Sequence, residues 1–357
     1  MNTTFDIPFS GRAHSYTESE VEVVVDVMRH AKSLTQGTHL REFEYKFIEY
    51  TGAVHAFAVS NATSALEIAA QLCRLKEGDE VIVPAHTFTS SAYPFLKTGA
   101  TIIWADIDLE TRVVTPSTLE PHISSRTRVV VVPHLYGYGA DVPGIKELTD
   151  RYGLLIVEDA AQAFGVDIEE KSVGTFGDFG VFSFHAHKNI STLGEGGMLV
   201  VKDEQYAKLV PMLRHNGHCQ FDGTRQDYWI PAMGNVDMPT IQGTELWPNN
   251  YCIGEASCAL GVHLIDRIDD INLGKRQRAI KFIDGLKDCV ELEFHRVDSR
   301  RHNYHLLVAR IRNGWRDLFI RRMAANHSIQ CVVQYYPLYN YPFYNLQKNI
   351  LIFYFLL

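Results

Sequence analysis

The stretch "RVVVVPHLYGYGADVPGIKELTDRYGLLIVED" (128–159) contains two short apolar runs separated by a polar segment. In "RVVVVP" (128–133) and "LLIVED" (154–159) the apolar residues are consecutive rather than alternating, which is typical of strands buried on both faces. Between them, "DVPGIKELTDRYG" (141–153) has the composition of a polar helix. A strand, a helix and a strand in this order predict two parallel strands of one sheet joined by a crossover helix.

The same alternation extends to both sides of this unit. Further strands are predicted at 56–60, 80–85, 101–107, within 178–188 and within 196–203, and a helix at 61–75. We therefore expect an α/β fold with a mostly parallel, mixed sheet covered by helices.

The second part of the chain has a different character. Residues 215–250 are rich in Gly, Asn and Pro and form a long excursion, of the length that usually serves a function or contacts a partner. A long helix is predicted from about Glu255 to Leu286, followed by a strand–helix–strand segment that ends at "SIQCVVQYYPL" (328–338). We predict a large domain over 1–250 and a smaller α+β domain over 251–357.

Composition narrows the class of protein. The chain is 46% hydrophobic and 21% charged with a net charge of -8, which argues against a nucleic-acid or anionic-membrane partner. There is no run of about 20 apolar residues, no leader-like start and no CxxC pair among six cysteines, so we expect a cytoplasmic protein with reduced thiols. The apolar ending "ILIFYFLL" (350–357) suggests either burial by a partner or a truncated or frame-shifted end, and we favour the latter.

Four segments at strand ends carry residues suited to chemistry, because parallel sheets build their ligand crevice there. The first is "SNATSAL" (60–66), a strand-to-helix turn of small polar residues. Its backbone N–H groups, with the hydroxyls of Thr63 and Ser64, could bind an anion. Alternatively, Ser60, Asn61 or Thr63 simply caps the helix.

Two further segments carry an aromatic and an acidic residue. "PAHTFTSS" (84–91) places Phe88 after a strand, as a packed aromatic or as a stacking surface for a flat ring. "IVEDAAQAFG" (156–165) ends an apolar run with Glu158 and Asp159, and Gln162 follows one turn later. A partly desolvated carboxylate needs a helix N–H or a cation as its partner, and a protonated ring nitrogen would serve.

The fourth segment is "SFHAHKNISTLGEGG" (183–197), which could use three chemistries. Lys188 could be a desolvated nucleophile that forms a Schiff base. His185 and His187 could face one way on a strand, but no third ligand accompanies them, and we predict no metal site. The glycine tail lacks the order of a dinucleotide loop or a P-loop, and is predicted to make a tight turn with a close backbone approach.

Together these features match one cofactor. An anion site, a stacking aromatic, an acid for a ring nitrogen and a Schiff-base lysine are what pyridoxal 5'-phosphate requires.

The order of "NATSAL", "PAHTF", "EDAAQAFG", "FSFHAHKN" and "GEGG" resembles the sugar aminotransferases of the DegT/DnrJ/EryC1/StrS group, over about residues 35–345. The resemblance implies the aspartate-aminotransferase-like fold of type I pyridoxal phosphate enzymes. It implies that Lys188 is the catalytic Schiff-base lysine, that Asp159 pairs with the pyridinium nitrogen and that Gln162 lies beside the phenolic oxygen. It also implies Phe88 as the stacking aromatic and Thr63, Ser64 and Ser183 as phosphate ligands.

The resemblance also implies a homodimer with shared active sites. Asn250 in "WPNNYCIGE" fits the position from which the neighbouring subunit reaches the phosphate, whereas Cys252 replaces the arginine of the family pattern. The implied reaction moves an amino group from L-glutamate to a nucleotide-linked keto-deoxysugar, for a surface polysaccharide such as an O-antigen or for a glycoside. The tyrosines of "QYYPLYNYPFY" (334–344) either line a site for this large acceptor or pack within the small domain.

Other functions remain open from the sequence. A sugar dehydratase of the same fold carries His in place of the Schiff-base lysine, and the spacing from Ser183 to "GEGG" favours Lys188 over His187. An aminotransferase for a keto-sugar acid and a non-catalytic binding descendant are further alternatives. A dinucleotide oxidoreductase is disfavoured by the missing glycine fingerprint.

Overall fold

The computed structural model describes residues 5–9, 11–12, 14–219, 234–345 and 350–351. The middle of the predicted excursion (220–233) and the end of the apolar tail (352–357) lie outside the described residues. The two tail residues that are described, Ile350–Leu351, form strand β16 beside β3.

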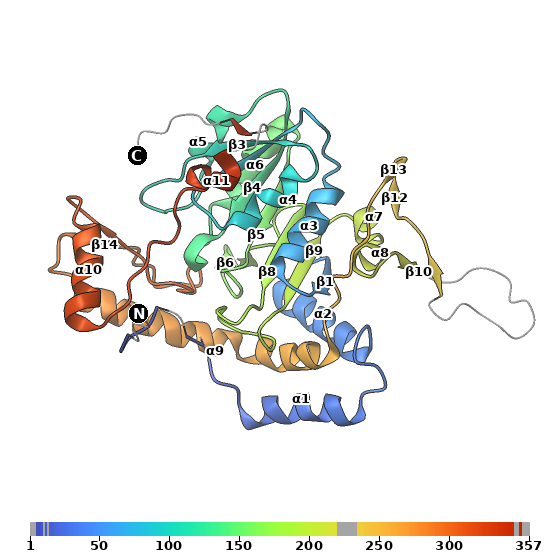
Figure 1. Cartoon of the computed structure of the whole chain (residues 1–357), viewed down its shortest axis with the longest axis horizontal. Helices are drawn as coiled ribbons and strands as arrows, with labels where there is room; N and C mark the ends of the chain where they lie inside the picture. Colours follow the sequence, from blue (N-terminus) through green and yellow to red (C-terminus); the bar gives the residue numbers. More distant parts are fainter. Residues whose placement is uncertain (1–4, 10, 13, 220–233, 346–349, 352–357) are drawn as a thin grey trace, which may run out of the picture.

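A single eight-stranded sheet forms the centre of the molecule, in the order β1-β9-β8-β5-β4-β2-β3-β16 (Figure 1). Every adjacent pair is parallel except those of β9, which is antiparallel to both β1 and β8. The predicted mostly parallel, mixed sheet is confirmed. The strands are β1 (His55–Val59), β2 (Glu80–Pro84), β3 (Thr101–Ala105), β4 (Thr127–Pro133), β5 (Leu155–Asp159), β8 (Phe179–Ser183), β9 (Gly197–Val201) and β16.

The opening stretch folds as predicted, with α6 (Val142–Tyr152) joining β4 to β5. The Asp141 side chain accepts a hydrogen bond from Gly144 N and caps the helix, and Gly153 ends it at φ +65°. Val129 and Val131 belong to the core on one face of the sheet, whereas Val130 and Val132 face the core under α6. All four valines are fully buried, which explains why this strand is apolar at consecutive positions.

Helices cover both faces of the sheet. On one face lie α3 (Ala62–Leu72) and α4 (Tyr93–Leu96), and on the other α2 (Thr38–Thr51) and the first half of α9 (Glu255–Gly285) pack against β1, β8 and β9. The helix α1 (Glu18–His30) lies along the outside of α9 (Figure 1). Phe43, Phe47, Phe164, Phe182 and Phe184 form an aromatic group between α2 and the sheet.

Beyond α9 the chain forms a small β14–β15 pair (Leu292–Phe294 and Ala309–Ile311) and α10 (Arg316–His327). The predicted strand over 328–338 is wrong. Apart from one bridge between Ile329 and Ile7, this segment is irregular up to the 3₁₀ helix η4 (Leu338–Asn340). Although β-branched, Val332 and Val333 are 41% and 49% exposed and no neighbouring strand pairs with them within the described residues, so propensity alone does not make a strand here.

The remaining short elements connect these layers. They are η1 (Thr89–Ser91), α5 (Pro116–Leu119), η2 (Glu120–His122), η3 (Leu135–Gly137), β6 (Asp167–Ile168), β7 (Lys171–Ser172), α7 (Glu204–Ala207), α8 (Val210–Arg214), β10 (His218–Cys219), β11 (Asn235–Val236), β12 (Thr240–Ile241), β13 (Thr244–Glu245) and α11 (Pro342–Asn345). The division into domains at residue 250 stays a prediction.

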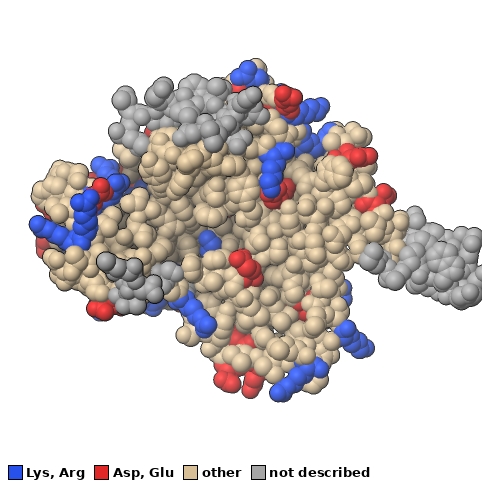
Figure 2. Space-filling view, in the orientation of Figure 1, with Lys and Arg blue, Asp and Glu red and all other residues tan. Residues whose placement is uncertain are grey.

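The surface carries charges of both signs. On the face shown in Figure 2, basic and acidic side chains are interspersed towards the edge and the middle is mostly uncharged. Within the described part of the chain, no helix is long and apolar enough to cross a membrane.

Candidate active site

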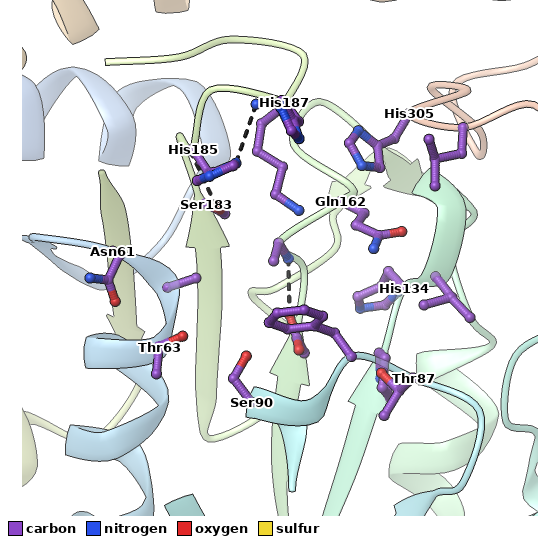
Figure 3. Close-up of a pocket in the computed structure, with 18 of the residues that line it drawn as sticks. Asn61, Thr63, Thr87, Ser90, His134, Gln162, Ser183, His185, His187 and His305 are labelled. Atoms are coloured by element: carbon purple, nitrogen blue, oxygen red, sulfur yellow. Dashed lines mark hydrogen bonds between the residues drawn. The ribbon is translucent and has the colours of Figure 1, made fainter. Parts of the chain in front are cut away.

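A cavity of about 930 Å³ opens where the parallel strands end (Figure 3). Seven of the eight residues predicted for the site line it: Thr63, Ser64, Phe88, Asp159, Gln162, Ser183 and Lys188. Asn61 and Thr63 face it from the start of α3, and Gln162 and His305 from the opposite side (Figure 3). The carboxyl edge of the sheet therefore gathers residues that are distant in sequence, as expected for an open parallel sheet.

Asp159, the last residue of β5, is only 8% exposed. Its Oδ2 accepts a hydrogen bond from Ser91 Oγ at 2.6 Å and its Oδ1 accepts one from Ala161 N at 3.2 Å. These partners are neutral, and Lys188 is the cation whose pKa responds to the Asp159 charge. A buried carboxylate with neutral partners favours a cationic group on its open side, such as a protonated ring nitrogen.

Glu158, the neighbour of Asp159, has a different environment and is fully buried. Its oxygens accept hydrogen bonds from the backbone N–H groups of Gly174, Phe176 and Gly177 and from Nε2 of His134. Successive residues of a strand point to opposite faces, so Glu158 secures the turn behind the sheet while Asp159 serves the cavity. The sequence pattern gave Glu158 no role of its own, and only the resemblance distinguished Asp159 from it.

The turn between β1 and α3 provides a corner for an anion. Asn61, not Ser60 or Thr63, caps α3, because its Oδ1 accepts a hydrogen bond from Ser64 N at 2.9 Å. The hydroxyls of Thr63 and Ser64 and the first N–H groups of an 11-residue helix thus lie beside the cavity, with Ser183 from the end of β8. The capping interpretation is confirmed for Asn61, and the anion site stays a prediction that the position of this helix start at the cavity supports.

Lys188 lies in the loop between β8 and β9, where its N–H donates to His185 O at 2.8 Å. The side chain is partly exposed to the cavity but surrounded by protein, and this desolvation lowers its pKa to about 8 while Asp159 opposes the shift. Desolvation disfavours the charged ammonium, so the amine is available near neutral pH. This is the environment expected of a nucleophilic lysine.

The glycine tail of the same loop makes the predicted close approach. A Cβ on Gly197 would lie 2.4 Å from the carbonyl carbon of Asn61, so only glycine lets β9 lie against the start of α3. The rings of His185 and His187 pack edge to face at 5.0 Å. Across the described ranges, no group of three His, Cys, Asp or Glu is placed to hold a metal ion.

Gln162 and Phe88 complete the wall around the cavity. Gln162 Oε1 accepts a hydrogen bond from Tyr136 N at 2.6 Å, and its Nε2 donates to Tyr335 Oη at 3.0 Å. Phe88 is 48% exposed at the cavity and its ring centroid is 6.0 Å from that of Tyr335. Of the tyrosine-rich segment, Tyr335 lines the cavity whereas Tyr344 is buried in the core, so each interpretation holds for one residue.

The structure adds residues that sequence reasoning missed. Lys275 on α9, His305 after β14 and His134 after β4 all line the cavity. None of the three lies in a motif, and no sequence signal singled them out. Asn250 is the predicted site residue that does not line the cavity of its own chain: it is exposed and paired with His215 in an isolated bridge.

These residues fit pyridoxal phosphate. The corner at the start of α3 suits its phosphate. The amine of Lys188, whose pKa is lowered by burial, suits its aldehyde carbon. Asp159, a carboxylate whose hydrogen-bond donors are neutral, suits its ring nitrogen. The three groups line one cavity, which is the arrangement that a phosphorylated pyridine aldehyde requires.

Comparison with known proteins gives the family. The model of the DegT/DnrJ/EryC1/StrS aminotransferase family matches residues 14–351. The spore coat polysaccharide biosynthesis protein SpsC of Bacillus subtilis is 31% identical, over 96% of this chain and 85% of that protein. The GDP-perosamine synthase of Escherichia coli O157:H7 is also 31% identical, over 93% of this chain and 85% of the synthase.

A solved structure with a similar fold is that of Spr1654 from Streptococcus pneumoniae in its PLP form. It has a TM-score of 0.79 and 27% identity, over 96% of this chain and 88% of that one. The chain therefore belongs to the DegT/DnrJ/EryC1/StrS aminotransferase family and is a pyridoxal phosphate-dependent sugar aminotransferase.

Proposed function

We propose that this enzyme transfers the amino group of L-glutamate to the keto group of a nucleotide-linked keto-deoxysugar, for a surface polysaccharide or a glycoside. The observation that carries the proposal is that Lys188, Asp159 and the anion corner share one cavity of about 930 Å³, which has room for a sugar beside the cofactor. The names of SpsC and GDP-perosamine synthase support the substrate class. Since nucleotide-linked sugars and L-glutamate are cytoplasmic metabolites, the proposal includes a cytoplasmic location.

Each residue has a role that its surroundings support. Thr63, Ser64 and Ser183 would bind the phosphate, and Phe88 would cover the ring. Asp159 would keep a proton on the ring nitrogen, because a buried carboxylate is stabilised by a cation beside it. Gln162 would lie beside the oxygen on the ring, and its hydrogen bonds with Tyr136 N and Tyr335 Oη support a fixed orientation of its amide.

The cofactor supplies an electron-withdrawing ring that stabilises negative charge on the carbon that loses a proton. Lys188 Nζ would remove that proton from the donor's α-carbon and deliver it to the carbon of the cofactor that had carried the aldehyde oxygen. A general base works best when its pKa is near the working pH, and desolvation lowers the pKa of Lys188 to about 8. The same amine then acts in the reverse sense on the sugar.

The proposal includes a homodimer in which Asn250 completes the site of the partner subunit. Asn250 is exposed, does not line the cavity of its own chain and is the last residue of the predicted excursion. The side-chain amide of Asn250 could donate a hydrogen bond to the cofactor phosphate bound in the site of the partner subunit.

The experiment is to load the purified protein with pyridoxal phosphate, record its visible absorption and add L-glutamate. We expect a band from protein-bound cofactor that bleaches as 2-oxoglutarate is released, and recovery of the band with a nucleotide-linked keto-sugar. Lys188→Ala should lose the covalent attachment and the reaction, whereas the control Lys202→Ala, outside the cavity lining, should keep both.

Three results would contradict the proposal. An unchanged spectrum in Lys188→Ala would remove that residue from the site. A band that no amino donor bleaches, together with loss of a sugar hydroxyl, would indicate the dehydratase alternative. Amination of a keto-sugar acid, but of no nucleotide-linked sugar in a panel, would replace the acceptor class.

A further inference from the structure

Lys275 is a second lysine in the cavity, and its charge is not neutralised. It is contributed by α9, and its Nζ donates to Asn189 Oδ1 at 2.8 Å and to the carbonyl oxygen of His305 at 3.3 Å. Both acceptors are neutral, and no carboxylate forms an ion pair with it among the residues that the structure describes. A lysine ammonium has three donors, so one remains for a ligand.

A chain of buried amides fixes the direction of Asn189. Its Nδ2 donates to Asn272 Oδ1 at 2.7 Å, and Asn272 Nδ2 donates to the carbonyl oxygen of Phe164 at 3.0 Å. Because the Phe164 carbonyl can only accept, both amides have one orientation, and Asn189 must present its oxygen to Lys275. Asn189 and Asn272 are 4% and 1% exposed, so this network is part of the core and holds the ammonium in place.

His305 contacts Lys275 through its carbonyl oxygen and lines the same cavity as Lys188. Its ring lines the cavity, and its buried Nδ1 has no hydrogen-bond partner within the described part of the chain. Burial and the two lysine charges hold its pKa well below the usual value, so the ring stays neutral. His305 therefore adds a neutral imidazole beside the Lys275 ammonium, and among the described residues no carboxylate forms an ion pair with that ammonium.

We infer that Lys275 binds the α-carboxylate of the amino donor, an inference that rests on the proposed function. The reacting carbon must lie at Lys188, and the α-carboxylate is bonded directly to that carbon. Lys275 donates to the side chain of Asn189, which directly follows Lys188 in the chain, and both lysines line the cavity, so an anion at Lys275 lies next to the reaction. A carboxylate gains a charge-assisted hydrogen bond there.

The other anions of the reaction do not suit this place. The cofactor's phosphate belongs to the corner at Asn61 and Thr63, across the cavity from His305 (Figure 3). The diphosphate of a nucleotide-linked sugar is separated from the reacting keto carbon by the sugar ring. The keto-sugar itself has no carboxylate, so Lys275 serves the donor half of the reaction and not the acceptor half.

The titration of Lys275 agrees with this assignment. Desolvation lowers its pKa to about 8, so the ammonium is only partly formed at pH 8 without a ligand. A carboxylate beside it raises that pKa again, and binding of the donor takes up a proton. Calorimetry in two buffers of different ionisation enthalpy measures this uptake apart from catalysis.

The decisive experiment compares L-glutamate with its α-carboxamide, L-isoglutamine, in the donor half-reaction of the holoenzyme. The wild type should prefer L-glutamate by about tenfold to a hundredfold, the range of one charge-assisted hydrogen bond. Lys275→Met should lose most of this preference, and Lys275→Arg should retain part of it. Lys281→Met, which removes an exposed lysine of the same helix, should behave as the wild type.

The acceptor half-reaction separates binding from a structural role. In Lys275→Met, the pyridoxamine form should still aminate the keto-sugar within about twofold of the wild-type rate, since a general distortion would slow both halves. Equal loss in both halves, or an unchanged preference for L-glutamate in Lys275→Met, would overturn the inference while the proposed function stands. If the wild type transfers nitrogen from no amino acid, the proposed function fails first, and the inference with it.

Discussion

Replacing Glu158 by glutamine tests whether the carboxylate behind Asp159 is the acceptor that secures this part of the fold. Glu158 accepts four hydrogen bonds: Oε1 from Phe176 N at 2.7 Å and Gly177 N at 2.6 Å, and Oε2 from Gly174 N at 2.7 Å and His134 Nε2 at 3.0 Å. Glutamine has nearly the same size and shape. The substitution therefore changes hydrogen bonding with little change in packing.

The tautomer of His134 confirms that it donates the fourth of these hydrogen bonds to Glu158. Its Nδ1 accepts a hydrogen bond from Ala140 N at 3.1 Å, so the ring proton is on Nε2 and points to Glu158. A glutamine has one oxygen and one NH2 group, and in either orientation the NH2 group faces two of the four donors. Two buried donors then lack acceptors, at about 1–3 kcal/mol each, or about 2–6 kcal/mol in total.

The measurement is thermal unfolding of the variant followed by circular dichroism, at fixed protein and cofactor concentrations because ligand binding shifts the midpoint. At about 2 °C per kcal/mol, the midpoint should fall by about 4–12 °C. Glu49→Gln is the matched control, since that side chain is 60% exposed and lies outside the cavity lining. A Glu158→Gln midpoint no lower than that of the control would refute the reasoning.

Two further outcomes follow from the site. Only the neutral amine attacks an aldehyde, and burial lowers the pKa of Lys188 to about 8. The rate at which the cofactor-free protein combines with pyridoxal phosphate should therefore rise with pH around pH 8. Stopped-flow absorbance at a series of pH values measures this rate, and an inflection near pH 10.5 would contradict the prediction. Gly197→Ala should lower stability by about 1–3 kcal/mol and weaken cofactor binding, because its Cβ would lie 2.4 Å from the carbonyl carbon of Asn61. Gly285→Ala, where a Cβ meets open space, is the control for unfolding and cofactor titration, and equal behaviour of the two variants would count against the close approach.

Sequence patterns predicted the sheet and most of the site for local reasons. Val129 to Val132 are consecutive apolar residues because both faces of β4 are covered. Burial on both faces can therefore be recognised from the sequence alone. Residues that follow such runs, among them Asp159 and Ser183, meet because parallel strands end at one edge of a sheet. The strand predicted over 328–338 failed because its formation depends on a neighbouring strand and not on its own β-branched residues.

What the sequence determined by itself is the order of strands and helices, the residues at the strand ends and, through Lys188 with its surrounding motifs, the cofactor. Tertiary structure alone added the side chains that lie outside the motifs, such as Lys275 and His305. Lys275 contacts Asn189 across 86 positions and Tyr335 contacts Gln162 across 173, so these contacts depend on the path of α9 and of the C-terminal segment over the cavity. The burial of a strand can be read from consecutive residues of the sequence. The orientation of a charged or amide side chain depends on partners that are distant in sequence and that only folding brings together.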